Sequence, residues 1–580
     1  MGAFFLLRDD VPDRLAARLA ALSADMADQG HGAPVALSAP GVELRVYAKQ
    51  TDDAPNVWMP PGGDGDFCVA TGSLLYRDGR GADALARLHG DLRGGTLDPN
   101  ALFGTFCLIA AVDGKVTLWT DRMGTYPVWH DTGMSVISSS FLAVARAAER
   151  LTLRDQCVYE YVFQGATYGG ETLFHEVSLL DSTRGWALAA RGAEAVAPLP
   201  APAVAPPPAR RGDEAAHLDR VLDPLRRYFR AIAAAFGGKV DTALSGGYDS
   251  RLTLALLREQ GVTPHVHVYG SEQSADVRVA RAVTEGEGIA LKHQDKGLAP
   301  RITPERLAQV VADNFAPFQG HPPDGLFENG TDLETRASRC AGGVLMLNGG
   351  GGEVFRNFFY LPDRPVSTLD LANCFYSGFD PAVCAGPFHG GRYLRTMADK
   401  LGRTAGVSGD VLSRRDVEFL YAGFRCRFWM GRNNGVNNRL GWSLTPFIDA
   451  AVVPAANDVP IGLKNHGRFE AAMIHAVDPA LAAYASDYGH DFSGPPPLKR
   501  VVKDWTTLAR PPILRRYSYR LRRRTRAGWP YLLGPGYVAA VVDPAFPRLS
   551  RYFRVDRVND PAHFARICTL EYLLDRLKVS

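Results

Sequence analysis

The most constraining feature of the sequence is the stretch VDTALSGGYDSRLTLALLRE, residues 240–259. A short apolar run, then glycines, then apolar residues at helical spacing predict a buried strand, a tight turn and an amphipathic helix. A second unit follows, with TPHVHVYGS as strand and SADVRVARAVTEGEG as helix. Strands that alternate with helices predict a parallel sheet in a doubly wound α/β fold.

The chain before this region has a different pattern. FCVATGSLLY, GTFCLIAAVDGKVTLWTDRMGTYPVWH and MSVISSS are short apolar stretches separated by Gly, Asp and Pro, which predicts antiparallel strands. The helical pattern PDRLAARLAALSADMA adds a helix layer, so the class is α+β. Repeated proline in residues 193–214 predicts an extended linker or exposed arm. We therefore expect domains at 1–192 and 215–580, with the chain mainly helical beyond about residue 370.

Composition sets the broad class. A chain of 580 residues is long enough for two or three domains, and 46% apolar with 22% charged residues is typical of a globular protein. A net charge of +3 does not indicate polyanion binding by the whole chain. The eight cysteines form no C-x-x-C pair, which argues against a zinc site or a disulfide framework. With no membrane-length apolar run and no signal peptide, we expect a cytoplasmic protein without a membrane span.

The glycine turn after the first strand has the residues of an anion site. Two glycines at a helix N-terminus leave backbone N–H groups free to point at a ligand. Ser245 and Ser250 can add hydroxyl donors, and Asp249 can hold a magnesium ion that accompanies a polyphosphate. The alternative is a plain turn without a ligand. The flanking Ser, Asp and Ser favour the phosphate interpretation.

The string SGGYDS resembles the pyrophosphate-binding loop of the N-type ATP pyrophosphatases. Three more stretches resemble asparagine synthetases: VLMLNGGGGEVFRNFF, GSEQSADVRVARAV and LGWSLTPFIDAAVVP, the last carrying Pro446, Phe447 and Asp449. In the N-terminal part, LFGTFCLIAAVDGKVTLWTDRMGTYPVWH and GETLFHEVSLL resemble the glutaminase domain of the same enzymes. The chain thus resembles the asparagine synthetase family in the broad sense, which includes β-lactam synthetases and lasso-peptide cyclases.

This resemblance implies a fold and a set of site residues. The fold would be an α+β, Ntn-hydrolase-like (glutaminase-like) domain followed by an α/β synthetase domain of the adenine-nucleotide α-hydrolase (PP-loop) type. The cofactors would be ATP and Mg²⁺, with Asp249 and Glu353 on the metal; the family has an Asp-Glu pair where this chain has Glu353 alone. Arg251 would face a substrate carboxylate or phosphate. The implied nucleotide contacts are Leu244, Ser245, Gly246, Gly247, Asp249, Ser250, Val268 and Gly350.

The sequence departs from the family at two places. Glutamine hydrolysis needs a cysteine after the initiator methionine, and this chain has Gly2; the Asn-Gly of the oxyanion hole is replaced by Thr71 and Gly72. We therefore expect an inactive glutaminase domain and an amine that arrives free. The family's late lysine is missing from YASDYGHDF. The candidates that remain open in its place are Lys464, Lys499, Lys503 and His490.

The expected function is ATP-dependent amide formation, in which a carboxylate is adenylated and then attacked by ammonia or an amine. The alternatives are an intramolecular amide former, a nucleotide-binding protein without catalysis, and a tRNA-modifying enzyme. Expected partners are small-molecule or peptide carboxylate and amine substrates, and a second copy in a homodimer. Seven arginines between residues 515 and 526 predict either a solvated helical face or a site for an anionic partner.

Overall fold

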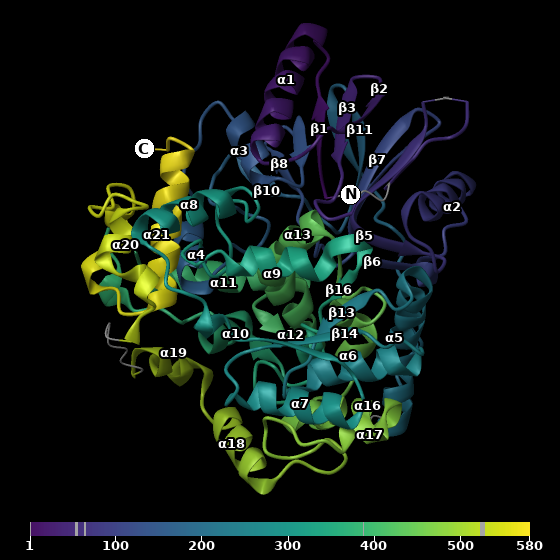
Figure 1. The fold of residues 1–580 in the computed structure, drawn as a ribbon, viewed down its shortest axis with the longest axis vertical. Coiled ribbons are helices and arrows are strands. Elements are labelled where there is room, and N and C mark those ends of the chain that lie inside the picture. Colours follow the sequence, from purple (N-terminus) through teal and green to yellow (C-terminus); the bar gives the residue numbers. More distant parts are fainter. Residues whose placement is uncertain are drawn as a thin grey trace.

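The computed structural model describes residues 2–52, 56–62, 65–210, 212–386, 388–521 and 528–579, with the backbone alone for 518–521. Within these residues the N-terminal half contains two antiparallel sheets of six strands, and the C-terminal half contains a parallel sheet of five (Figure 1). This confirms the change from antiparallel to parallel architecture that the sequence predicts.

The two antiparallel sheets pack face to face between helices. In β1 (Ala3–Arg8), Phe4 and Leu6 point into the apolar layer between the sheets, while Phe5 and Leu7 point to the outer helices. This alternation follows from the two-residue period of a strand. The outer helices are α1 (Pro12–Asp28) and α3 (Phe141–Ala147) on the first sheet and α2 (Gly81–Gly94) on the second.

The apolar stretches picked out in the sequence as antiparallel strands correspond to β5–β9, whereas the other strands of these sheets were not predicted one by one. The first sheet has the order β10-β8-β9-β1-β3-β2 and the second β12-β11-β7-β6-β5-β4. Besides β1, the first sheet contains β2 (Val35–Ala39), β3 (Val42–Tyr47), β8 (Trp129–Asp131), β9 (Val136–Ser138) and β10 (Val177–Leu179). The second contains β4 (Val57–Trp58), β5 (Phe67–Tyr76), β6 (Leu102–Val112), β7 (Lys115–Thr120), β11 (Gly185–Ala189) and β12 (Gly192–Val196).

The proline-rich segment is held against the protein. Its first residues belong to β12, which pairs with β11. Farther on, the Trp119 Nε1–H donates to the carbonyl of Ala197 at 3.1 Å, and Arg220 Nε donates to that of Ala205 at 2.6 Å. Leu199 is buried against the helix α2 side of the second sheet. The segment therefore packs along both halves of the chain up to α5 (Glu214–Phe236).

The parallel sheet has the strand order β15-β14-β13-β16-β19. Its central strand β13 (Val240–Ala243) leads into α6 (Tyr248–Glu259), and β14 (His265–Tyr269) leads into α7 (Ala275–Gly286), as the sequence predicts. Apolar residues of these strands and helices form one buried cluster. The other strands are β15 (Leu291–Gln294), β16 (Leu345–Leu347) and β19 (Trp442–Leu444).

The two halves share an interface built on buried hydrogen bonds. Ser73 Oγ of β5 donates to Asn438 Oδ1 at 2.6 Å and accepts from the Ser443 backbone N–H at 3.0 Å. Lys49 Nζ donates to the carbonyls of Asn438 and Gly441, each at 2.8 Å. These bonds fix β5 against the β19 edge of the parallel sheet, and one apolar cluster runs through both halves.

The rest of the chain is mainly helical, and α21 packs against α4 of the N-terminal half (Figure 1). A short antiparallel pair joins β17 (Val366–Ser367) to β18 (Val411–Leu412). None of the described helices is both long and apolar enough to cross a bilayer. The remaining α-helices are α4 (Asp155–Gln164), α8 (Pro304–Phe315), α9 (Thr331–Cys340), α10 (Thr368–Phe375), α11 (Gly390–Ala405), α12 (Arg414–Leu420), α13 (Gly431–Leu440), α14 (Val453–Asn457), α15 (Ile461–Lys464), α16 (Arg468–Val477), α17 (Pro479–Ala482), α18 (Leu498–Leu508), α19 (Pro512–Leu521), α20 (Pro535–Ala539) and α21 (Pro561–Arg576).

Candidate functional site

The glycine turn, residues 244–247, joins β13 to α6 at the carboxyl edge of the parallel sheet. Ser245 of this turn is bonded to Ser250 of α6: Ser245 N–H donates to Ser250 Oγ at 3.0 Å, and the two hydroxyl oxygens lie 3.1 Å apart. Gly247 N–H donates to Ser245 Oγ at 3.3 Å. The serines therefore fix the shape of the turn at the N-terminus of α6.

Two further carboxylates lie beside this turn. Gly246 N–H donates to Asp276 Oδ1 at 2.8 Å, and Asp487 N–H donates to the carbonyl of Gly246 at 3.1 Å. A Cβ on Gly246 would lie 2.5 Å from Asp487 Cβ, so this position requires glycine. Burial raises the pKa of the Asp487 carboxyl, and Asp276 raises it further. An anion on Gly246 N–H would have to displace Asp276.

A second loop, residues 348–353, follows β16 and reaches the start of α6. A Cβ on Gly349 would lie 2.7 Å from Thr253 Oγ1, and one on Gly352 would lie 2.7 Å from Asp249 Cγ. Close packing on α6 thus explains Gly349 and Gly352 of the glycine run. It brings Glu353 to the side of Asp249, and these are the two residues that the resemblance assigns to magnesium.

Arg356 joins acidic residues from α6, the second loop and α16. Its Nη2 donates to Asp249 Oδ1 at 2.6 Å and lies 3.3 Å from Glu353 Oε1, and its Nε lies 3.0 Å from Glu470 Oε2. We call Asp249, Glu353 and Glu470 the carboxylate cluster. Glu470 comes from α16 and is fully buried. The Tyr421 hydroxyl donates to the other oxygen of Glu353.

The charges of this cluster are unbalanced, because three carboxylates surround one guanidinium. Burial raises the pKa of Asp249, and burial together with the Asp249 charge raises that of Glu470 well above its ordinary value. Burial opposes the charge on Arg356, yet the carboxylates hold its pKa well above the usual range. Protons on these carboxyls, or a further cation, would relieve the excess negative charge.

A pocket of about 240 Å³ opens beside the cluster, and Arg500 of α18 closes one side of it. The Arg500 guanidinium lies 4.2 Å from the ring centre of Tyr488 and 5.2 Å from that of Tyr248. Its Nε and Nη1 are buried and have no hydrogen-bond partner among the described residues. The pocket is lined by Glu353, Arg356, Asn357, Phe358, Tyr360, Lys464, Asn465, His466, Gly467, Tyr488, Arg500, Asp504 and Leu508.

The floor of this pocket is a strained turn. His466 has a φ of 63°, in the left-handed region, and its Nδ1 lies 3.0 Å from Asp504 Oδ2. The next residue, Gly467, approaches Tyr248 so closely that a Cβ would lie 2.8 Å from the ring. Asn465 accepts a 2.9 Å bond from Asn357. The turn therefore contacts the start of α6 through Tyr248 and the chain just after the second loop through Asn357.

Other predicted residues lie away from the cluster. Arg251 is fully buried, donates to the carbonyls of Tyr484 and Ala485 at 2.6 and 2.8 Å, and stacks on Phe492. It holds the 484–492 segment over the glycine turn and does not face the pocket. Leu244 and Val268 are buried in the apolar cluster of the parallel sheet. Gly350 N–H donates to Asn348 Oδ1 at 2.9 Å.

The four candidates to replace the family's late lysine differ in burial and in their distance from the pocket. Lys464 is fully buried against Glu418 and lines the pocket, and burial lowers its pKa. Lys499 and Lys503 are exposed. His490 lies in the 484–492 segment, where burial lowers its pKa. The cation that sequence reasoning missed is Arg500, the neighbour of Lys499.

Two further residues at the cluster, Arg356 and Glu470, were not predicted from the sequence, and only the first has a local pattern that could have indicated it. Arg356 follows Glu353 by three residues, which is one turn of a helix, so a short helical turn after the glycine run would have indicated their pairing. Glu470 lies in an ordinary apolar helix more than a hundred residues away, and no local pattern singles it out.

Gly2, where the resemblance expects a cysteine, is closely surrounded by backbone atoms. Gly2 N–H donates to the carbonyl of Tyr47 at 2.9 Å, and a Cβ on Gly2 would lie 2.7 Å from the carbonyl oxygen of Arg439. It would also lie 2.9 Å from that of Ala48. In this conformation residue 2 has no room for a side chain.

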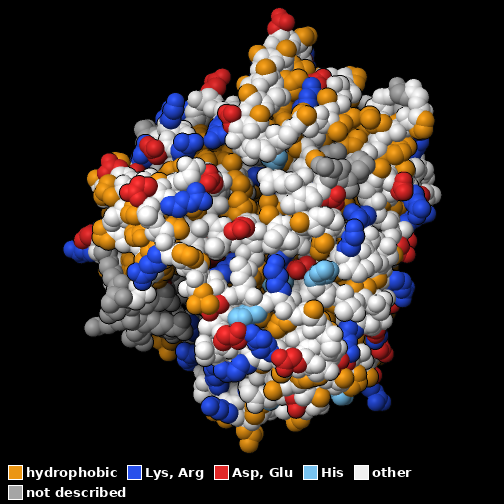
Figure 2. Space-filling view, in the orientation of Figure 1, with side chains coloured by type: hydrophobic (Ala, Val, Ile, Leu, Met, Phe, Trp, Pro, Cys, Tyr) orange, Lys and Arg blue, Asp and Glu red, His pale blue; other side chains and the backbone are white. Residues whose placement is uncertain are grey.

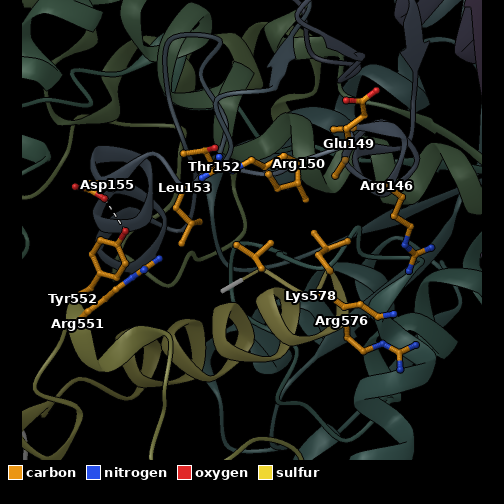
Figure 3. Close-up of a pocket in the computed structure, with 15 residues that line it drawn as sticks. Arg146, Glu149, Arg150, Thr152, Leu153, Asp155, Arg551, Tyr552, Arg576 and Lys578 are labelled. Carbon is orange, nitrogen blue, oxygen red and sulfur yellow. Dashed lines mark hydrogen bonds between the residues drawn. The ribbon is translucent and has the colours of Figure 1, made fainter.

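A larger cavity, of about 900 Å³, lies between the chain at residues 145–155 and the end of α21. Figure 3 shows the Tyr552 hydroxyl bonded to Asp155 at one end, and the basic side chains of Arg146, Arg576 and Lys578 at the other. It includes none of the predicted site residues.

The chain matches no protein-family model and no curated protein.

Proposed function

We propose that this protein activates a carboxylate with ATP and magnesium and transfers the acyl group to an amine, so that an amide, AMP and pyrophosphate are formed. One observation carries the proposal. Asp249, in the first turn of α6 after β13, and Glu353, in the loop after the neighbouring strand β16, lie against the same nitrogen of Arg356. Both lie at the carboxyl edge of a parallel sheet, which is where ligands bind in open α/β folds.

The residues present fit a magnesium ion by their donor chemistry. Mg²⁺ prefers carboxylate oxygens and keeps several waters, and it is bound through one or two protein carboxylates together with substrate phosphates. Among the described residues no three His, Cys, Asp or Glu side chains form a preformed metal site. Asp249 and Glu353 would hold the ion, and Arg356 would have to release Asp249 for it.

Each group has a defined part in the proposed chemistry. Hydroxide is a poor leaving group, so an amine does not displace it from a carboxylate at a useful rate. ATP, when bound, supplies AMP as the better leaving group, and magnesium neutralises phosphate charge. The chain's own contribution would be the helix N-terminus at Gly247, the hydroxyls of Ser245 and Ser250, and the guanidiniums of Arg356 and Arg500, which would stabilise the developing negative charge.

The amine is proposed to arrive without glutamine hydrolysis, because residue 2 has neither a thiol nor room for one. Ammonia and an amino group of the substrate itself both remain compatible with the pocket. In the second case the reaction would close a ring, as β-lactam synthetases and lasso-peptide cyclases do.

A second candidate, a nucleotide-fold protein without ligase activity, is favoured by a specific observation. Asp276 occupies the Gly246 N–H, and Asp487 lies against the same glycine. Carboxylates at this place repel a polyphosphate unless a cation lies between them. This candidate predicts no pyrophosphate release with any substrate.

The test is to mix the purified protein with ATP, magnesium and pairs of a carboxylate and an amine, including aspartate with ammonia, and to measure pyrophosphate and AMP. Release that requires the carboxylate is expected. Asp249→Asn should abolish it, whereas Asp219→Asn, on the exposed side of α5, should not. Equal activity in the two variants, or none in the wild type, contradicts the proposal.

A further inference from the structure

Exposed apolar side chains gather on α18 and α19, which lie in the lower part of Figure 1. Large apolar residues exposed elsewhere on the described surface are scattered singly, as on any soluble protein. Here six fall within a stretch of 20 residues. They are Leu498 (81% exposed), Val502 (58%), Trp505 (64%), Ile513 (53%), Leu514 (55%) and Tyr517 (39%).

The two sides of α18 have opposite characters. Leu498, Val502 and Trp505 follow one another at spacings of four and three residues, so they form one stripe on the helix. The other side carries Arg500 and Asp504, which line the pocket beside the carboxylate cluster. A surface helix normally turns its apolar side inward. In α18 the apolar stripe faces solvent and the polar side faces the protein.

The exposed side is also positively charged. Lys499 and Lys503 are exposed next to the apolar stripe, and Arg510 is exposed between α18 and α19. The one acidic residue between positions 498 and 521 is Asp504, which is buried and turned toward His466. Figure 2 shows apolar side chains at the lower tip, where Figure 1 places α18, beside a group of Lys and Arg side chains.

We propose that this outer face of α18 and α19 docks on an anionic membrane surface. Apolar side chains on one face of a helix enter the boundary between headgroups and acyl chains, and tryptophan prefers that depth. Lysine and arginine beside them attract anionic headgroups. An exposed Trp505, an apolar stripe and cations with no outward-facing acid among residues 498–521 match a lipid surface in both apolar character and charge.

Docking here would act on the pocket through the same helices. Arg515 of α19 donates to the carbonyls of Phe359 and Tyr360 at 3.0 and 2.8 Å, close to the second loop. A bilayer that holds α18 also holds Arg500 and Asp504 at the pocket wall. The substrate of the proposed reaction would then be an amphipathic or lipid-borne molecule that enters the pocket from the membrane surface. This last step rests on the proposed function, whereas the docking itself does not.

The experiment is co-sedimentation of the full chain, without ATP, with vesicles of mixed phosphatidylcholine and phosphatidylglycerol, compared with vesicles of pure phosphatidylcholine. We expect binding to the mixed vesicles, weakened by added salt, and little binding to the neutral ones. Lys499→Glu, Lys503→Glu and Arg510→Glu together should weaken binding at least tenfold, since each cation near an anionic surface is worth roughly a factor of five.

The apolar contribution is tested by changing Leu498, Val502 and Trp505 together to Ser, which should also weaken vesicle binding at least tenfold. Because all three are exposed, the thermal midpoint should stay that of the wild type. The matched controls are Leu298→Ser, at an equally exposed site, and Lys292→Glu; neither should change binding.

Three results would overturn the docking proposal. They are no binding to the mixed vesicles, unchanged binding in both multiple variants, and a dimer in light scattering that the Ser variant dissociates, which would make a second copy the occupant. A protein that binds vesicles yet releases no pyrophosphate would leave the docking intact and contradict the proposed function alone.

Discussion

The guanidinium of Arg356 donates to Asp249 Oδ1 at 2.6 Å and so ties the second loop to the first turn of α6. The same side chain is the one cation in direct contact with Glu353 and Glu470 among the described residues. Arg356 therefore determines how stable the carboxylate cluster is and how easily a metal ion can take the place of the guanidinium.

Removing Arg356 should destabilise the protein strongly. Arg356→Ala leaves three carboxylates facing one another, and an uncompensated buried charge costs about 3–5 kcal/mol. We expect that loss in the free energy of unfolding from urea titration, partly restored by magnesium, which should bind the variant more tightly. Arg191→Ala, which breaks an exposed pair with Asp10, should cost under about 1 kcal/mol. Equal stabilities of the two variants would contradict this role.

Gly352→Ala should push the second loop away from α6 and α16. The new Cβ would lie 2.7 Å from Asp249 Cγ and 2.7 Å from Glu470 Oε1. Such crowding in a packed interior costs about 1–3 kcal/mol. Gly391→Ala is the matched control, because a Cβ there meets open space in α11 and alanine favours a helix. Thermal unfolding separates the two, and a Gly352→Ala protein as stable as the wild type would show that the approach is looser than described.

Asp449 should make stability depend on pH. Burial, with a further effect of Asp121, raises its pKa to about 7, although it accepts bonds from Ala451 N–H and Gly104 N–H. In the unfolded chain the pKa is about 4, so between pH 4 and 7 the folded state holds the proton and the unfolded state has lost it. The free energy of unfolding therefore falls as pH rises through this range.

The variant Asp449→Asn cannot ionise, so its own unfolding free energy should lack this fall. Urea titrations at pH 4 and pH 8 give the unfolding free energy of each protein. Between these two pH values, the wild type should lose stability relative to the variant. A difference that stays constant between the two pH values would show that Asp449 ionises normally in the folded protein.

Gly2→Cys should not create a glutaminase. A Cβ at this position would lie 2.7 Å from the Arg439 carbonyl oxygen, so the thiol would displace the interface between the halves. We expect no glutamate release from glutamine and a loss of about 1–3 kcal/mol in unfolding free energy. Gly32→Ala, where a Cβ meets nothing within 4 Å, controls for a change of glycine near the N-terminus. Glutamate release by Gly2→Cys would overturn this interpretation.

Local patterns predicted the elements that hold the site. The run from Val240 to Glu259 is strand, turn and helix in the structure because its apolar spacing is set by near neighbours. The approach of Glu353 to Asp249 follows from the parallel order of β13 and β16. Glu470 and Arg500 arrive from distant helices, so their convergence depends on packing that no local pattern encodes.

Arg251 shows the limit of assigning a residue by its neighbours in a motif. It follows Ser250 directly, yet helical geometry turns it about 100° further round, into the interior. There it binds the carbonyls of Tyr484 and Ala485. The seven-arginine segment shows another limit, because residues 522–527 lie outside the described part of the chain and only its first arginines are placed.

The central claim, adenylation at the carboxylate cluster, is tested most directly by isotope exchange between pyrophosphate and ATP in the absence of any amine. The account predicts exchange that requires both magnesium and a carboxylate substrate and that Asp249→Asn abolishes. Tight ATP binding with no exchange across a broad set of carboxylates, peptides and lipid-borne acids included, would contradict it.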